Sequence, residues 1–278
     1  MMVRLCGNAD AAVVEVAGGS CHTWIMKPLS DPTGIDAAAQ WDRVDALAAE
    51  LVAAGADAGL PFVAAQADLG DAAPMADRSG QPYAAMFPWL QAGGEYWNNR
   101  RLALESSFLH AARLLAEPIW FADGKLQTWR PTHILDLVDC SRVEADFGIT
   151  GALMAPAHLP AGQVGAVVWV TTGPIDMKSV FDAHAERMFA LAFKFLASHT
   201  ELVAARQRVT PAQLTRREAQ CVRWAAAGKT TAEIGIILSL SVSTVRFHLR
   251  NAGDKFGATT RARLIQMATG HGFLGPEA

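Results

Sequence analysis

Apolar side chains recur with helical spacing in three stretches of the first two hundred residues. Between residues 36 and 59 they are three or four positions apart and the run ends in glycine, which predicts an amphipathic helix. The stretch 176–199 has the same spacing along one side. The stretch 95–117 is also helical in pattern, with a break near Ser106 and Ser107.

Strand patterns lie between these helices. Residues 60–69 have the composition of a strand, whereas residues 118–133 form an irregular aromatic segment. Residues 147–175 contain no Asp, Glu, Lys or Arg, but prolines and glycine interrupt the middle of this run. This predicts a hairpin with strands at 151–155 and 165–172 rather than a membrane span. We therefore expect an α/β body up to about residue 200.

The C-terminal residues carry clear helix-start signals. Two capping boxes, in which a hydroxyl and a glutamate each satisfy a free backbone donor, open consecutive helices. Ser241 or Ser243 caps a third helix that stops at Gly257, and residues 259–272 form a fourth. Four short helices, with the second and third joined by a tight turn, predict a helix-turn-helix. The boxes are Thr215 with Glu218 and Thr230 with Glu233.

Charge is divided unevenly along the chain of 278 residues, whose formal net charge is −3. From Arg208 onward there are ten Lys and Arg against four Asp and Glu, which gives +6, and the remainder carries −9. A basic tail beside an acidic body indicates a polyanion partner for the tail, although a solvated charged face gives the same count. A length of this size favours two domains of ordinary size or one large domain, and 51% hydrophobic residues are ample for a packed core.

The third helix of the tail presents two different sides. Val245, Leu249 and Ala252 form its core side, which leaves arginines four positions apart on the opposite side. Such a helix fits the major groove, where an arginine can bond to the O6 and N7 of guanine. Threonines and cations nearby would contact phosphates, and His248 is equally compatible with a core position. The predicted DNA-binding residues are Arg246, Phe247, Arg250, Ser243, Thr230, Thr231, Lys229, His248, Lys255 and Arg261.

No pattern in the sequence indicates catalysis, a metal site or a cofactor. The four cysteines are scattered without a CxxC pair, which fits a reducing cytoplasm, and no secretory signal is apparent. Cys21 and His22 are adjacent, but sequence neighbours rarely form a nucleophile–base couple in space. We therefore expect a cytoplasmic protein that is not an enzyme and does not contact a membrane.

The stretch from Leu214 to about Leu274, which includes "LTRREAQCVRWAAAGKTTAEIG" and "SVSTVRFHLRNAGDKFG", resembles the DNA-binding domain of the LuxR family of bacterial transcription regulators. The resemblance implies a homodimer on operator DNA, with the last helix pairing protomers and Arg246, Phe247 and Arg250 contacting bases. The body resembles the autoinducer-binding domain of the quorum-sensing members through "PIWF" and residues 147–169. This implies an α+β protein: an N-terminal α-β-α sandwich with an antiparallel sheet enclosing an acylated lactone, followed by the four-helix helix-turn-helix domain.

The body departs from that family pattern at the ligand. A gap-free count places Ser106 where the family has its lactone-binding aspartate, and Val168 where serine or threonine is frequent. We therefore expect a ligand other than a standard acyl-homoserine lactone, flatter or aromatic, although the aromatic residues are equally compatible with a core. The predicted ligand-binding residues are Trp89, Tyr96, Trp97, Ser106, Trp120, Phe121, Trp129 and Val168.

The expected organisation is an N-terminal extension at 1–40, a ligand-binding domain at 41–200, a linker at 201–212 and the DNA-binding domain at 213–278. The function expected is a ligand-responsive regulator, with double-stranded DNA bearing a palindromic operator, a small-molecule signal and a second copy of the chain as partners. Two alternatives remain: a ligand-independent DNA binder whose body is a dimerisation scaffold, and a standard acyl-homoserine-lactone receptor.

Overall fold

The computed structural model describes residues 37–71, 73–90, 106–206 and 213–274. A five-stranded antiparallel sheet with the order β1-β5-β4-β2-β3 organises the first part of the chain. This confirms the expected antiparallel sheet and the α+β class. The strands are β1 (Phe62–Gln66), β2 (Ile119–Ala122), β3 (Lys125–Gln127), β4 (Gly151–His158) and β5 (Val164–Thr171).

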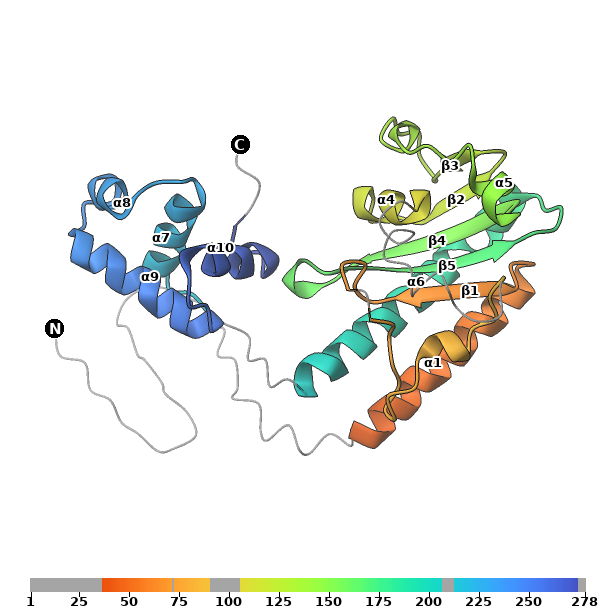
Figure 1. The fold of residues 1–278 in the computed structure, drawn as a ribbon, viewed down its shortest axis with the longest axis horizontal. Coiled ribbons are helices and arrows are strands. Elements are labelled where there is room, and N and C mark those ends of the chain that lie inside the picture. Colours follow the sequence, from red (N-terminus) through yellow and green to blue (C-terminus); the bar gives the residue numbers. More distant parts are fainter. Residues whose placement is uncertain (1–36, 72, 91–105, 207–212, 275–278) are drawn as a thin grey trace, which may run out of the picture. The chain divides into compact units, whose positions relative to one another are not determined.

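Helices cover both faces of this sheet (Figure 1). The long helices α1 (Ala37–Asp57) and α6 (Met177–Arg206) pack on one face, where Val167 and Trp169 of β5 join their buried side chains. The helices α4 (Ser107–Leu114) and α5 (Val143–Phe147) lie on the other face, with Ala166, Val168 and Val170. Because successive strand residues point to opposite faces, one apolar run such as β5 serves two cores.

Trp169 fixes how closely α1 approaches the sheet. Its indole Nε1 donates a buried hydrogen bond of 2.9 Å to the carbonyl of Leu51. A Cβ on Gly55 would lie 2.6 Å from both Trp169 Cδ1 and the carbonyl oxygen of Leu60. The glycine in α1 is therefore required by packing, since no side chain fits between the helix and the indole.

The hairpin at 118–133 was not expected, because this segment was predicted to be irregular. β2 and β3 pair with Trp120 opposite Gln127, and the two-residue turn between them is Asp123-Gly124. Both turn residues have positive φ, 50° and 71°, as a type I′ turn requires. The Asp-Gly pair was the sequence signal for this hairpin.

Two predicted boundaries are shifted. β4 continues through Pro156, which was assigned to the turn, and the chain reverses at the 3-10 helix η4 (Pro160–Gly162). On the β2 side of β4, strand pairing ends at Met154. Pro156 lies beyond this point and pairs only with β5 among the described strands, so its lack of an N–H removes no hydrogen bond to β2. α6 continues through Arg206, so the first part of the predicted linker 201–212 is helical.

The C-terminal residues form the four predicted helices: α7 (Arg216–Ala226), α8 (Thr231–Leu238), α9 (Val242–Phe256) and α10 (Arg261–Gly270). Both capping boxes are present, and Ser241 is the residue that caps α9. The α8–α9 turn passes through Ser239 with φ of 53°. It also needs Gly235, whose Cβ would lie 2.8 Å from the carbonyl oxygen of Leu240.

Within the described ranges, no single helix is long and apolar enough to cross a membrane, and only α8 and α9 taken together, bent by 106°, meet that test of length and composition.

Candidate functional site

The outer side of α9 presents polar and cationic side chains on a well-anchored helix. Val245 and Ala252 are fully buried on the opposite side, whereas Ser243, Arg246 and Arg250 are exposed. Phe247 is 50% exposed, an unusual setting for a large aromatic side chain. These positions match the two sides predicted from the sequence.

Arg250 and Phe247 support one another on this surface. The guanidinium carbon of Arg250 lies 6.0 Å from the centroid of the Phe247 ring, and the ring of His248 meets Phe247 edge-on at 5.8 Å. A cation over an aromatic face loses less side-chain freedom when it binds a partner. His248 itself is half-buried, which is intermediate between the exposed phosphate contact and the core position that the sequence left open.

An open groove of about 700 Å³ runs between α9 and the first turns of α8 and α10. Arg246 and Arg250 line one side, and Thr231, Thr260 and Arg261 line the other. Helix N-termini carry partial positive charge and free N–H groups, so two of them and two arginines favour an anion in this groove, against the one carboxylate of Asp254 that also lines it. A contact of this groove with backbone phosphate stays a prediction.

Some predicted phosphate contacts are already engaged inside the domain. Lys255 Nζ donates to Glu218 Oε2 at 2.7 Å, and Arg261 Nη2 donates to the carbonyl oxygens of Ala225 and Lys229 at 3.0 and 2.5 Å. The Thr230 hydroxyl is held by the carboxylate of its own capping box. The structure thus gives Lys255, Arg261 and Thr230 a positioning role, and their contact with DNA stays a prediction.

Glu218 is a buried charge that ties α7 to α9. Its exposed fraction is 4%, and it accepts from Lys255 and from the backbone N–H of Thr215. Burial acts to raise the pKa of Glu218, but the hydrogen bonds from Lys255 and Thr215 prevail and hold this pKa below its ordinary value. The carboxylate is therefore ionised and fixes the end of α9 that follows Arg246 and Arg250.

The body contains a cavity of about 940 Å³ on the α4/α5 side of the sheet. Its floor is formed by strand residues with mostly small or apolar side chains, and α4 and the segment 137–149 form its walls. Small side chains at Ala64, Ala166 and Val168 leave this space open. A volume in this range is typical of sites for small organic ligands.

The predicted ligand-binding residues fall into three groups. Trp89, Ser106 and Val168 line the cavity. Trp120, Phe121 and Trp129 do not, and Tyr96 and Trp97 lie outside the described residues.

Strand geometry explains why neighbouring aromatic residues separate. Phe121 is on the cavity side of β2, but it packs edge-on against Phe108 at 5.5 Å within the core. Trp120 points to the other face, where its ring lies 6.2 Å from that of Phe181. Trp120 and Phe121 were both predicted to bind the ligand, but the alternation of strand side chains assigns them to two different cores.

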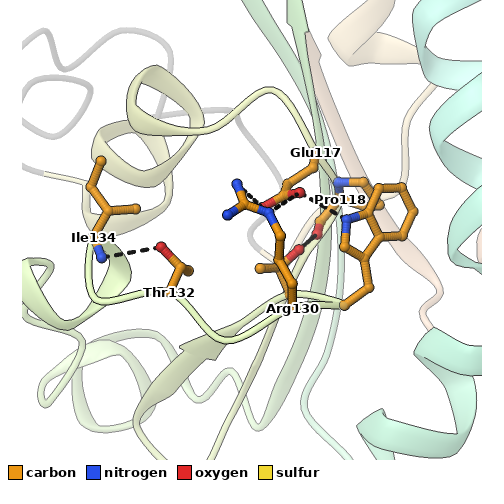
Figure 2. A network of polar contacts seen from close by, with 7 residues as sticks. Glu117, Pro118, Arg130, Thr132 and Ile134 are labelled. Carbon is orange, nitrogen blue, oxygen red and sulfur yellow. Dashed lines mark hydrogen bonds and ion pairs between the residues drawn. The ribbon is translucent and has the colours of Figure 1, made fainter.

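A polar network around Glu117 and Arg130 holds the segment that contains Trp129 (Figure 2). Trp129 Nε1 donates to Glu117 Oε2 at 2.8 Å, and Arg130 contacts both oxygens of this carboxylate at 3.1 and 3.0 Å. Thr128 Oγ1 donates to the carbonyl oxygen of Pro118 at 2.7 Å. These bonds fasten the segment after β3 to the start of β2, which leaves Trp129 53% exposed.

Gln66 lines the cavity and was not predicted from the sequence. It ends β1, is 4% exposed, and is the one polar side chain in that strand. A polar residue inside the apolar run "FVAAQ" was the available signal, because buried polar side chains require specific partners.

Comparison with known proteins places the chain. Residues 212–268 match the family model described as "Bacterial regulatory proteins, luxR family". The transcriptional activator protein VanR of Vibrio anguillarum is 31% identical over 182 residues, which cover 62% of this chain and 72% of VanR. The chain belongs to the LuxR family. It is a LuxR-type, DNA-binding transcriptional regulator whose relatives are named as transcriptional activators.

Other LuxR-type proteins match along much of the chain. The transcriptional activator protein AhyR of Aeromonas hydrophila is 28% identical over 189 residues, 68% of this chain and 70% of that protein. Among solved structures, Escherichia coli SdiA matches with a TM-score of 0.40 and 20% identity, over 64% of this chain and 72% of that one. The family model and the match to VanR confirm the family resemblance seen in the sequence.

Proposed function

We propose that this LuxR-type protein is a ligand-responsive regulator: a small molecule in the body cavity controls how the helix-turn-helix binds a palindromic operator as a homodimer. The observation that carries the proposal is the cavity of about 940 Å³ inside the body. A body serving only as a dimerisation scaffold has no need of such a volume, since protein interiors are otherwise close-packed. Ligand binding would stabilise the folded body by mass action.

The DNA side of the proposal rests on α9. Arg246, Phe247 and Arg250 would reach base edges, and the groove shared with α8 and α10 would receive backbone phosphate. Two copies of the helix on one duplex, about 34 Å apart, would require half-sites separated by one helical turn.

The ligand proposed is not a standard acyl-homoserine lactone. Ser106, which lines the cavity, occupies the position that the family resemblance assigns to a carboxylate acceptor. A neutral hydroxyl accepts an amide proton less strongly than a carboxylate does, by about 1 kcal/mol or more. Asp139 and Asp146 do line the cavity, but both side chains are exposed and their charge is screened by solvent.

The test uses the full chain and a DNA site selected from a random duplex pool. Melting temperature and operator affinity are measured with extracts of cultured bacteria, with purified acyl-homoserine lactones, and with buffer alone. We expect an extract component to raise the melting temperature and to change operator affinity, and the lactones to do neither. Full operator binding without any ligand, together with no thermal shift from any sample, would establish the scaffold alternative instead.

A matched pair of variants locates the effect. Val168→Phe places a large side chain on the cavity floor and should abolish both the thermal shift and the ligand-dependent change in operator affinity, while the operator affinity of the ligand-free protein stays unchanged. Trp129→Phe alters an exposed aromatic residue outside the cavity and should leave the shift unchanged.

A further inference from the structure

The cavity floor contains one deeply buried polar side chain, that of Gln66. It is 4% exposed, whereas the neighbouring floor positions Ala64, Ala166 and Val168 are apolar. Gln66 stands opposite Ala166 in the pairing of β1 with β5. A buried amide in apolar surroundings is costly unless its hydrogen-bonding groups are used.

The orientation of this amide is fixed by its surroundings. Nε2 donates to the carbonyl oxygens of Asp71 and Ala73 at 3.2 and 2.7 Å. If the amide were turned over, its own oxygen would face two carbonyl oxygens, so only the NH₂ group can occupy this side. The amide oxygen Oε1 is therefore the acceptor that remains.

Oε1 of Gln66 is available from the cavity. No donor among the described residues reaches Oε1. Oε1 is also absent from the set of unbonded side-chain atoms that are completely buried, so it keeps some accessible surface. Gln66 lines the cavity, so Oε1 is the unused acceptor at this position of the floor.

Among the residues that the structure describes, the buried part of the cavity lining carries no charge. His110, Asp139, Arg142 and Asp146 line the cavity, and all four are exposed, so they lie where solvent reaches the opening. The charges of Arg142 and Asp146 are also directed toward one another, at 3.4 Å. An ionised ligand group placed against the floor would lose its hydration without gaining a partner.

From these contacts we propose that Gln66 selects the ligand: the cavity takes a neutral, mainly apolar molecule with a hydroxyl or N–H group that donates to Gln66 Oε1. This inference rests on the proposed function, in which the cavity binds a small molecule. A ligand without a donor leaves the oxygen buried and unpaired, and the site discriminates against it for that reason.

The experiment compares three probes of one shape on the full chain by titration calorimetry at neutral pH. 4-Hexylphenol carries a donor, 4-hexylanisole has the same ring and chain with the donor methylated, and 4-hexylbenzoate is charged. We expect the phenol to bind about fivefold to tenfold more tightly than the anisole, as one neutral hydrogen bond allows. The benzoate should bind more weakly than either.

Two variants assign the preference to one oxygen. Gln66→Leu should remove the difference between phenol and anisole, because the acceptor is gone, while the anisole still binds. Ser106→Ala removes the hydroxyl at the start of α4, another cavity-lining acceptor, and should keep the difference. If Gln66→Leu does not fold, the comparison of the three probes on the unaltered chain still decides whether the cavity prefers a neutral ligand that carries a donor.

The outcomes separate the two proposals. Binding of phenol and anisole with equal affinity overturns the role of Gln66 and leaves a ligand cavity in place. Tightest binding by the benzoate overturns the neutral ligand class. Failure of all three probes, together with no thermal shift from culture extracts, removes the ligand cavity and with it both proposals.

Discussion

In the proposed function, single side chains on α9 determine how this LuxR-type protein meets DNA. Arg246 and Arg250 line a groove with the helix starts of α8 and α10, and Phe247 supports Arg250 from beside it. A guanidinium braced in this way is positioned before DNA arrives, so the loss of conformational freedom on binding is smaller. Affinity should therefore respond strongly to one substitution.

Arg250→Ala should weaken operator binding by about 1–3 kcal/mol and relax the base preference at one position, because it removes a bidentate contact. Binding is measured on the selected operator and on single-base variants of it. Arg217→Ala, at an exposed arginine of α7 that contacts Gln220, is the matched control and should bind as the unaltered chain does. Equal base preference in both variants would contradict base reading by Arg250.

Glu218 makes a second prediction at this scale, about stability and pH. The pKa of Glu218 is lower in the folded chain than in the unfolded one. Its contribution to the free energy of unfolding is therefore fully present above the ordinary pKa of a glutamate and is lost as the pH falls through the pKa of the folded state. Lys255→Met should cost about 1–3 kcal/mol of unfolding free energy at neutral pH, because it leaves a buried carboxylate without its cation.

Denaturant unfolding of both chains between about pH 3 and pH 7 measures this effect, over the range in which a glutamate titrates. The difference between the chains should shrink toward acid pH, where Glu218 becomes protonated in both. A difference that is constant with pH would mean that Lys255 contributes through packing alone.

Whole elements show which parts of the fold can be predicted from sequence. Helix starts depend on a few adjacent residues, so the capping boxes at Thr215 and Thr230 located α7 and α8 directly. The cavity depends on contacts between distant strands, as in the pairing of Gln66 with Ala166 one hundred residues away. The spacing of apolar residues does not reveal such contacts. Trp120 and Phe121 were therefore both predicted to line the ligand pocket, whereas in the structure they lie on opposite faces of β2.

Gly55 gives a prediction at the element scale, because it sets the approach of α1 to the sheet. Alanine would gain about 0.8–1 kcal/mol of helix propensity, yet its Cβ would lie 2.6 Å from Trp169 and from a backbone oxygen. Overpacking of this kind costs about 1–3 kcal/mol, so we expect Gly55→Ala to be net destabilising. Gly173→Ala, where the nearest atom is 3.8 Å away, is the control and should change the midpoint of thermal unfolding little.

The proposed function combines two kinds of recognition that respond differently to salt. Residues from Arg208 onward carry +6, whereas the rest of the chain carries −9, and the buried cavity-lining residues that the structure describes are uncharged. DNA affinity arises largely from displaced counterions, and burial of a neutral apolar ligand does not.

Raising salt from about 50 to about 200 mM should weaken operator binding at least tenfold and leave 4-hexylphenol binding within about twofold. Fluorescence anisotropy for DNA and calorimetry for the phenol measure the two on one preparation. A parallel loss of both would show that charge contributes to binding in the cavity as well.

The amide of Gln66 also connects the two sides of the sheet. Its NH₂ group binds the carbonyls of Asp71 and Ala73, and a few residues on, the carbonyl of Ala76 lies 3.0 Å from Nε2 of His199 on α6. The carbonyl groups of Asp71, Ala73 and Ala76 thus have hydrogen-bond partners on both sides of the sheet. Gln66 bonds the first two on the cavity side, and His199 of α6, the helix that precedes the helix-turn-helix in sequence, contacts the third. In the proposed function, a ligand that donates to Oε1 would polarise the whole amide and strengthen the hydrogen bonds from its NH₂ group to Asp71 and Ala73.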